Sequence, residues 1–144
     1  MRYFPLLSLL FSLLVTATPT VFAGNKHWPV EIFDVMDNQR LVIFLANEDI
    51  VASPQWQPIQ GGPPLSIAAA LEHTSRWIAQ EPRLKGAKVH EIKLNRIHGY
   101  ESDNRWYYLF QLRTHKGRKS SAHYVAVLFN GKVVPVIVEP ASIK

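Results

Sequence analysis

The strongest constraint on the fold is an alternation of apolar and polar residues along the last third of the chain. Apolar residues recur at every second position in several runs between positions 87 and 138, and short turn-forming stretches separate the runs. This alternation is typical of antiparallel strands with one buried face. Asn130-Gly131 is the clearest turn signal, because both residues tolerate the positive φ of a type I′ turn. We therefore predict an antiparallel meander over 87–138.

The turns of this meander also set a register. Centring them on Asn130-Gly131 and Gly117-Arg118, with a third loop at 99–104, makes one sheet face almost wholly apolar. The predicted opposite pairs are Phe129 with Lys132, Val127 with Val134, Val125 with Val136, His123 with Val138, Leu112 with His123, Phe110 with Val125, Tyr108 with Val127, Trp106 with Phe129, Ile92 with Phe110, and Leu94 with Tyr108.

Before the meander, a helix is predicted over 66–80, with Ser66 as its N-cap. Its apolar positions recur at the three- and four-residue spacing of one helix face. They are Ile67, Ala70, Leu71, Thr74, Trp77 and Ile78. We expect this face to pack on the apolar face of the sheet.

The N-terminal part of the domain contains two short β-rich runs, which we interpret as a hairpin over 30–46 with its turn near Asp37-Asn38-Gln39. Positions 47–64 hold many proline, glycine, asparagine and acidic residues, and predict a connector without regular structure. Trp56 lies within this connector. We expect it to anchor the connector to the domain rather than to stack on a ligand.

Composition and the N-terminus indicate an exported protein. Residues 1–23 combine one positive charge, a short apolar run and small residues before Gly24, which predicts a cleaved secretory signal peptide. The remainder, 24–144, is expected to form a single α+β domain that is periplasmic or secreted, with no stable membrane insertion after cleavage. The chain is 47% apolar and contains no cysteine, which argues against a disordered chain and excludes a disulfide scaffold. Its net charge of +5 is spread along the sequence, so nucleic-acid binding is not expected.

Together these elements predict an α+β fold in which an antiparallel sheet of four to five strands packs on one amphipathic helix. The second sheet face is too apolar to be left in water. Either the N-terminal hairpin or the connector covers it, or a protein partner or a second copy does. Pro135 lacks an amide proton and predicts that the last strand is an edge or carries a bulge. The candidate contact residues are Tyr107, Arg113, Tyr124 and Ile137.

The chain carries no recognisable catalytic motif. There is no cysteine nucleophile and no Gly-x-Ser-x-Gly elbow, and we expect no cofactor. His90 and His123 both fall opposite Leu112, two strands apart, which is unsuited to a shared metal ion, so no metal site is expected. A pocket between helix and sheet, with His90, His123, Tyr108 and Trp77 converging on it, is the alternative. A third possibility is that the basic loop around Lys116, Arg118 and Lys119 docks on anionic polymers.

From Ser66 onward the chain resembles the PepSY family and, more broadly, cystatin-like sheets that curl around one helix. Ser66–Leu71, Trp106–Phe110 and Tyr124–Val134 carry this resemblance, which covers roughly the last 80 residues. PepSY domains occur in exported bacterial proteins and protease propeptides, where they are thought to restrain peptidases. The resemblance implies no catalytic residues. We therefore expect an exported, non-enzymatic binding or interaction domain, the alternative being a small ligand-binding protein or enzyme.

Overall fold

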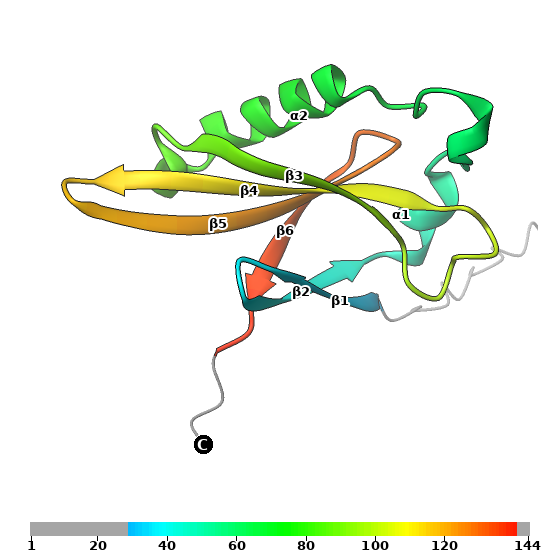
Figure 1. The fold of residues 1–144 in the computed structure, drawn as a ribbon, viewed down its shortest axis with the longest axis horizontal. Helices are drawn as coiled ribbons and strands as arrows, with labels where there is room; N and C mark the ends of the chain where they lie inside the picture. The colour runs from blue at the N-terminus through cyan, green and yellow to red at the C-terminus, as the bar shows by residue number, and fades with distance from the viewer. Residues whose placement is uncertain (1–28, 141–144) are drawn as a thin grey trace, which may run out of the picture.

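In the computed structural model, residues 29–140 are described, and the predicted signal peptide lies outside them. This part of the chain is an α+β fold with a six-stranded antiparallel sheet and one main helix (Figure 1). The strands follow the order β1-β2-β6-β5-β4-β3. Their bounds are β1 Val30–Met36, β2 Gln39–Leu45, β3 Lys88–Arg96, β4 Trp106–Lys116, β5 Lys119–Leu128 and β6 Val133–Val138. The predicted four to five strands were too few, because β6 joins the N-terminal hairpin to the meander.

The central pairings have the predicted register. Leu112 lies opposite His123 and Phe110 opposite Val125, as the turn at Gly117 requires. On the other side of β4, Ile92 lies opposite Phe110. His90 does not lie opposite Leu112. It falls at a register shift between Val89 and Glu91, and Val89 takes the predicted place.

The predicted register of β6 is wrong by one residue. Val134 pairs with Ala126, not with Val127. The cause is the turn: only Gly131 of the Asn130-Gly131 pair has a positive φ. The Leu128 N–H donates to the Lys132 carbonyl at 2.9 Å and the Gly131 N–H donates to the Leu128 carbonyl at 2.8 Å, which makes a three-residue loop. Because side chains alternate, this slip moves every β6 side chain to the opposite face.

The sheet coils so far that the β1–β2 hairpin lies across one face of β4 and β5 (Figure 1). The hairpin therefore both joins the sheet and covers its second face, which confirms an intramolecular cover. The core inside this curl draws on the hairpin, β4, β5 and a short helix, α1 (Asn47–Ala52). Its largest fully buried side chains include Ile32, Met36, Leu41, Ile43, Ile50, Tyr107 and Leu109.

The main helix, α2 (Ile67–Gln80), covers the opposite face of β4 and β5 and forms a second core with it (Figure 1). It begins where predicted, since the Ser66 hydroxyl accepts a hydrogen bond from the Ala69 N–H at 3.1 Å. Ala70 and Thr74 are fully buried, whereas Ile67 is half exposed and lies outside the packed face. A side chain in place of Gly131 would displace the His73 ring, and the positive φ of Gly131 favours glycine in the turn before β6.

The connector over 47–64 differs from the prediction in its first part. Residues 47–52 form α1, and a 3-10 turn, η1, spans Pro58–Gln60. Trp56 anchors the connector as expected. Its ring lies edge-on to Trp106 at 5.3 Å between centroids, and its carbonyl accepts a hydrogen bond from the Trp106 indole N–H at 2.8 Å.

Asp34 on β1 ties the hairpin to the rest of the sheet. Its carboxylate accepts hydrogen bonds from the Tyr107 hydroxyl at 2.7 Å and from the Asn95 amide. Burial, together with the adjacent Asp34, raises the pKa of the Tyr107 hydroxyl above its ordinary range, so this hydroxyl remains a donor. Lys93 on β3 also donates to the Val35 carbonyl at 2.9 Å. The two outer strands of the sheet, β1 and β3, are thus linked through side chains.

The Asp34→Ala variant should lower the free energy of unfolding by about 1–3 kcal/mol, because the buried Tyr107 hydroxyl loses its acceptor. Urea denaturation followed by circular dichroism measures this change. Glu31→Ala is the matched control, since Glu31 is exposed on the same strand, and its effect should stay within about 0.5 kcal/mol. Equal effects of the two variants would show that Asp34 does not hold the hairpin in place.

Candidate functional site

No element among residues 29–140 covers the convex face of the sheet over β1, β2 and the second half of β6. Residues here point away from the core inside the curl, and α2 covers the part of this face formed by β4, β5 and the beginning of β6. Pairing aligns Phe33 with Val42, and Val42 with Ile137, in one row across three strands. We call this surface the outer apolar face, and it consists of Phe33, Val35, Val42, Phe44, Pro135 and Ile137.

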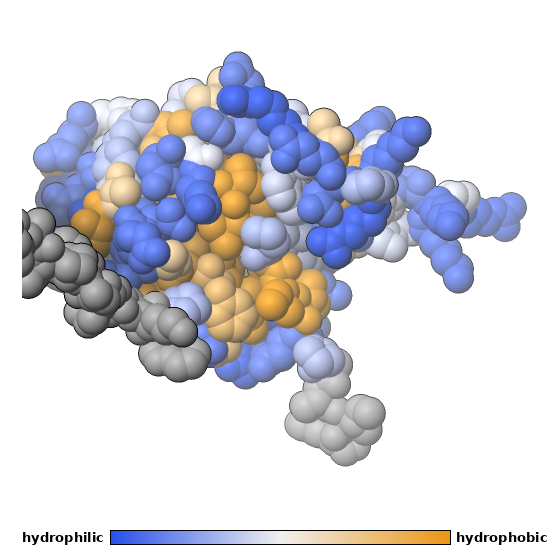
Figure 2. All heavy atoms as spheres, turned by 180° about the vertical axis from the view of Figure 1, so that it is seen from behind, coloured by the Kyte–Doolittle hydropathy of each residue, from blue (hydrophilic) through white to orange (hydrophobic). Residues whose placement is uncertain are grey.

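Large apolar side chains on this face are strongly exposed. Phe33 is 49% exposed, Val35 59% and Ile137 54%. The rear view of the molecule shows apolar side chains gathered in its middle and lower part, with polar side chains around them (Figure 2). An apolar surface that spans three neighbouring strands differs from the isolated exposed apolar residues of ordinary surfaces. It has the character of a contact surface.

Charged residues lie at the margin of the outer apolar face. Arg40 Nε contacts Glu139 Oε2 at 2.9 Å, across the β2–β6 pairing. The Arg40 guanidinium also lies over the Phe33 ring, 4.8 Å from its centroid. An apolar centre with a charged margin is the usual composition of a protein–protein interface.

The structure separates the four predicted contact residues. Tyr107 and Tyr124 are 1% and 3% exposed and face the hairpin, so a partner cannot reach them while the hairpin is in place. Arg113 is partly exposed and forms an ion pair of 2.9 Å with Asp37 at the hairpin turn. Ile137 lies on the outer apolar face. The one-residue slip of β6 explains why Ile137 does not share a face with Tyr124.

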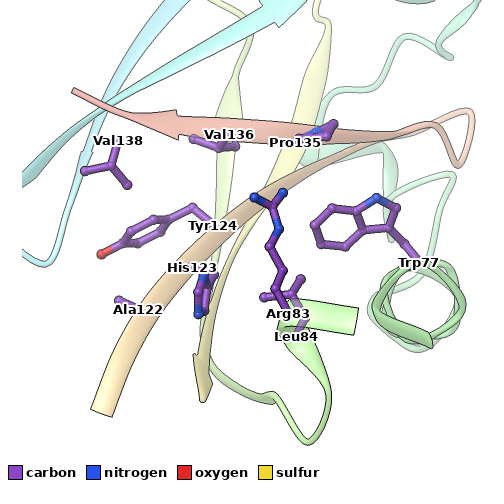
Figure 3. Close-up of a pocket in the computed structure, with 9 residues that line it drawn as sticks. All are labelled: Trp77, Arg83, Leu84, Ala122, His123, Tyr124, Pro135, Val136 and Val138. Atoms are coloured by element: carbon purple, nitrogen blue, oxygen red, sulfur yellow. The ribbon is translucent and has the colours of Figure 1, made fainter. Parts of the chain in front are cut away.

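A small pocket opens where β5 and β6 diverge. It has a volume of about 100 Å³, and its walls come from β5, β6, the end of α2 and a 3-10 turn, η2 (Pro82–Leu84). Trp77 and Arg83 lie on one side of it and the two strands on the other (Figure 3). Of the residues predicted to converge on a pocket, only Trp77 and His123 line it. Tyr108 is buried and donates its hydroxyl hydrogen to the Leu65 carbonyl at 2.8 Å, and His90 is exposed.

His123 and Arg83 are the ionisable side chains of this pocket that can bear positive charge. Burial, and secondarily the charge of Arg83, lower the pKa of the His123 imidazole. Its Nε2 lies 3.0 Å from the Thr114 hydroxyl, which fixes the ring in place. At neutral pH the pocket therefore combines a neutral imidazole with a guanidinium group.

Three other features bear on function: metal-binding groups, membrane-spanning helices and the basic tip of the β4–β5 hairpin. Between residues 29 and 140, no three histidine or acidic side chains gather in a way that could hold a metal ion. No helix in the same range is long and apolar enough to cross a membrane. Lys116, Arg118 and Lys119 lie at the exposed tip of the β4–β5 hairpin. That tip projects beyond the end of α2 (Figure 1).

Comparison with known proteins does not identify a relative. No protein-family model, curated protein or solved structure matches this chain. The geometry of the outer apolar face and of the pocket therefore carries the functional interpretation.

The Arg83→Gln variant should raise the pKa of His123, because it removes a positive charge that disfavours the imidazolium. NMR titration of the His123 ring protons measures this change. Lys85→Gln removes the same charge two residues away and should leave the pKa of His123 unchanged.

The lowered pKa also has a consequence for stability. Below pH 6.5, the ordinary pKa of histidine, the unfolded chain takes up a proton that folded His123 resists, so stability falls as the pH falls. A His123→Gln variant should lose less stability than the wild type between pH 7 and pH 5. An unchanged dependence on pH would contradict this role of His123.

Proposed function

We propose that this chain is an exported, non-enzymatic protein-interaction domain whose contact surface is the outer apolar face. The observation that carries the proposal is the row Phe33–Val42–Ile137, in which Val42 is partly buried and Phe33 and Ile137 are 49% and 54% exposed. Burying apolar surface contributes about 25 cal/mol per Å². A partner that covers this face would therefore gain a substantial free energy of binding.

The shape of the surface favours a protein as the partner. Three neighbouring strands present a continuous face rather than a cavity, and the aromatic side chains Phe33 and Phe44 are of the type that anchors interfaces. Arg40 and Glu139 at the margin provide charges that a partner can complement. An envelope peptidase is the first partner class to test, because it is the one implied by the sequence resemblance.

The alternative of a ligand-binding protein or enzyme has less support. Pockets for small molecules and cofactors usually have volumes of about 300–1,000 Å³. The pocket beside Trp77 has only about 100 Å³. Its two predicted companions, Tyr108 and His90, lie elsewhere, so the polar groups expected to serve a ligand do not converge.

A photo-cross-linking residue placed at position 137 should capture a discrete protein in cells that export this chain. The same residue at position 59 is the control, because Ile59 is 92% exposed but lies in the connector, away from the outer apolar face. With the captured partner purified, Phe33→Ser and Ile137→Ser should each weaken binding about tenfold or more, and Ile59→Ser should not. Mass spectrometry would distinguish a second copy of this chain from another protein.

Two results would contradict the proposal. One is equal capture at positions 137 and 59. The other is a purified complex whose affinity is unchanged by Phe33→Ser and Ile137→Ser. The melting temperature of each variant serves as the control for folding, and it should change little because both side chains are exposed.

A further inference from the structure

The pairing between β5 and β6 stops halfway along β5. The pairs of these two strands in the described chain run from Val127 with Val133 to Val125 with Pro135. Beyond Pro135, β6 turns away and pairs with β2 from Val136 to Val138. Among residues 29–140, the part of β5 from Lys119 to His123 therefore pairs with β4 on one side and with no strand on the other.

This unpaired edge of β5 presents backbone groups for another strand. The two-residue turn between Lys116 and Lys119 fixes the alternation, so the odd-numbered residues of β5 bond to β4. The N–H and C=O groups of Ser120 and Ala122 then point away from β4, towards the gap that β6 has left. Those of Tyr124 still face β6, because the pairing of Val125 with Pro135, which has no N–H, places Val136 opposite Tyr124. An edge of this kind accepts extended peptides by strand addition.

The side chains on either side of this edge differ in character. His123 lies on the face that α2 covers, next to Arg83, and Lys119 lies on the same face near the tip. Ala122 and Tyr124 lie on the other face, where Val136 and Val138 of β6 continue an apolar wall. Figure 3 shows Arg83 reaching from η2 across the gap towards β6, between Trp77 and Tyr124.

We propose that the edge of β5 from Lys119 to His123 binds an extended segment of a partner protein, in which acidic and apolar residues alternate. The segment adds antiparallel to β5, in the place that β6 leaves after Pro135. An acidic side chain opposite His123 meets the guanidinium of Arg83. The apolar side chains lie opposite Ser120 and Ala122, and the one opposite Ala122 packs against the wall formed by Val136 and Val138.

Charge complementarity selects an acidic segment. Positions 113–123 contain no acidic residue. Arg113 is paired with Asp37, so Lys116, Arg118 and Lys119 near the exposed tip supply the positive charge. Arg83 has an acidic neighbour, Glu81, whose Oε2 lies 3.3 Å from its Nε, but the Arg83 side chain remains 71% exposed and has further N–H donors. The pocket lined by Arg83 and His123 lies beside this edge of β5 and has room for a single side chain. That space fits one carboxylate side chain of a peptide.

The inference goes beyond the proposed function, because it requires a different surface. The outer apolar face consists of side chains on the convex side of β1, β2 and β6, whereas the edge of β5 binds through its backbone. A Phe33→Ser variant should bind the peptide as the wild type does. Failure of one proposal therefore leaves the other open to its own test.

The test uses the blocked peptide acetyl-Ser-Glu-Val-Glu-Val-Glu-Ser-amide and the purified, isotopically labelled protein. NMR titration should shift the amide signals of Ser120 and Ala122 and give a dissociation constant. The same peptide with lysine in place of glutamate should bind at least about tenfold more weakly. Arg83→Gln should weaken binding of the acidic peptide about tenfold, since it removes a charge-assisted contact, whereas Lys85→Gln should change it less than twofold.

Backbone methylation distinguishes strand addition from attraction by charge alone. In the proposed register the valine amides face β5 and the glutamate amides face away from it. N-methylation of the two valines should abolish binding, and N-methylation of the glutamates should be tolerated. The inference is overturned if both methylated peptides bind like the parent, if Arg83→Gln and Lys85→Gln have equal effects, or if the acidic peptide does not bind at millimolar concentration.

Discussion

The path of β6 is the constraint on which the rest of the structure depends. Its first half pairs with β5 and its second half with β2, so a single short strand joins the meander to the N-terminal hairpin. This path brings the hairpin across the second face of β4 and β5 and closes the larger core. Pro135 lies where β6 changes its pairing partner from β5 to β2. This position is within the sheet rather than at the predicted edge. The missing N–H of Pro135 is tolerated there because the described pairing with β2 begins only at the next residue.

Both candidate binding surfaces follow from this path. The coil of the sheet has an inside, which is filled, and an outside, which one helix of 14 residues covers only in part. The uncovered part is the outer apolar face. The departure of β6 from β5 leaves backbone groups without a strand partner and opens the small pocket beside them. If β6 continued along β5 beyond Pro135, the edge of β5 would be paired and the pocket would not open.

Local patterns predicted much of the fold because they rest on short-range physics. The N-cap at Ser66, the helix over 66–80, the hairpin around Asp37-Asn38 and the register between β4 and β5 were all correct, since each depends on residues close in sequence. The predicted register of β6 was wrong, although Asn130-Gly131 correctly predicted the position of the turn. The Asn130 side chain accepts a hydrogen bond from the Lys132 N–H at 3.0 Å and its amide donates to the Asp49 carbonyl, contacts that accompany the longer loop. The slip of one residue placed Ile137 on the exposed face, whereas Tyr107 and Tyr124 are buried because the hairpin covers their face.

By itself, the sequence determined which segments form strands and helix, because alternation, helical spacing, capping and turn residues act within a few positions. It also indicated that the second face of the meander needs a cover. Only the tertiary structure decided what that cover is, since a carboxylate such as Asp34 finds Tyr107 and Asn95 across more than 60 positions of the chain. The exposed face of the hairpin and the free edge of β5 were likewise decided only by the tertiary structure. Both depend on how the whole sheet coils, which is set by pairing between strands far apart in sequence. Such pairing leaves no local sequence pattern in the residues that it exposes.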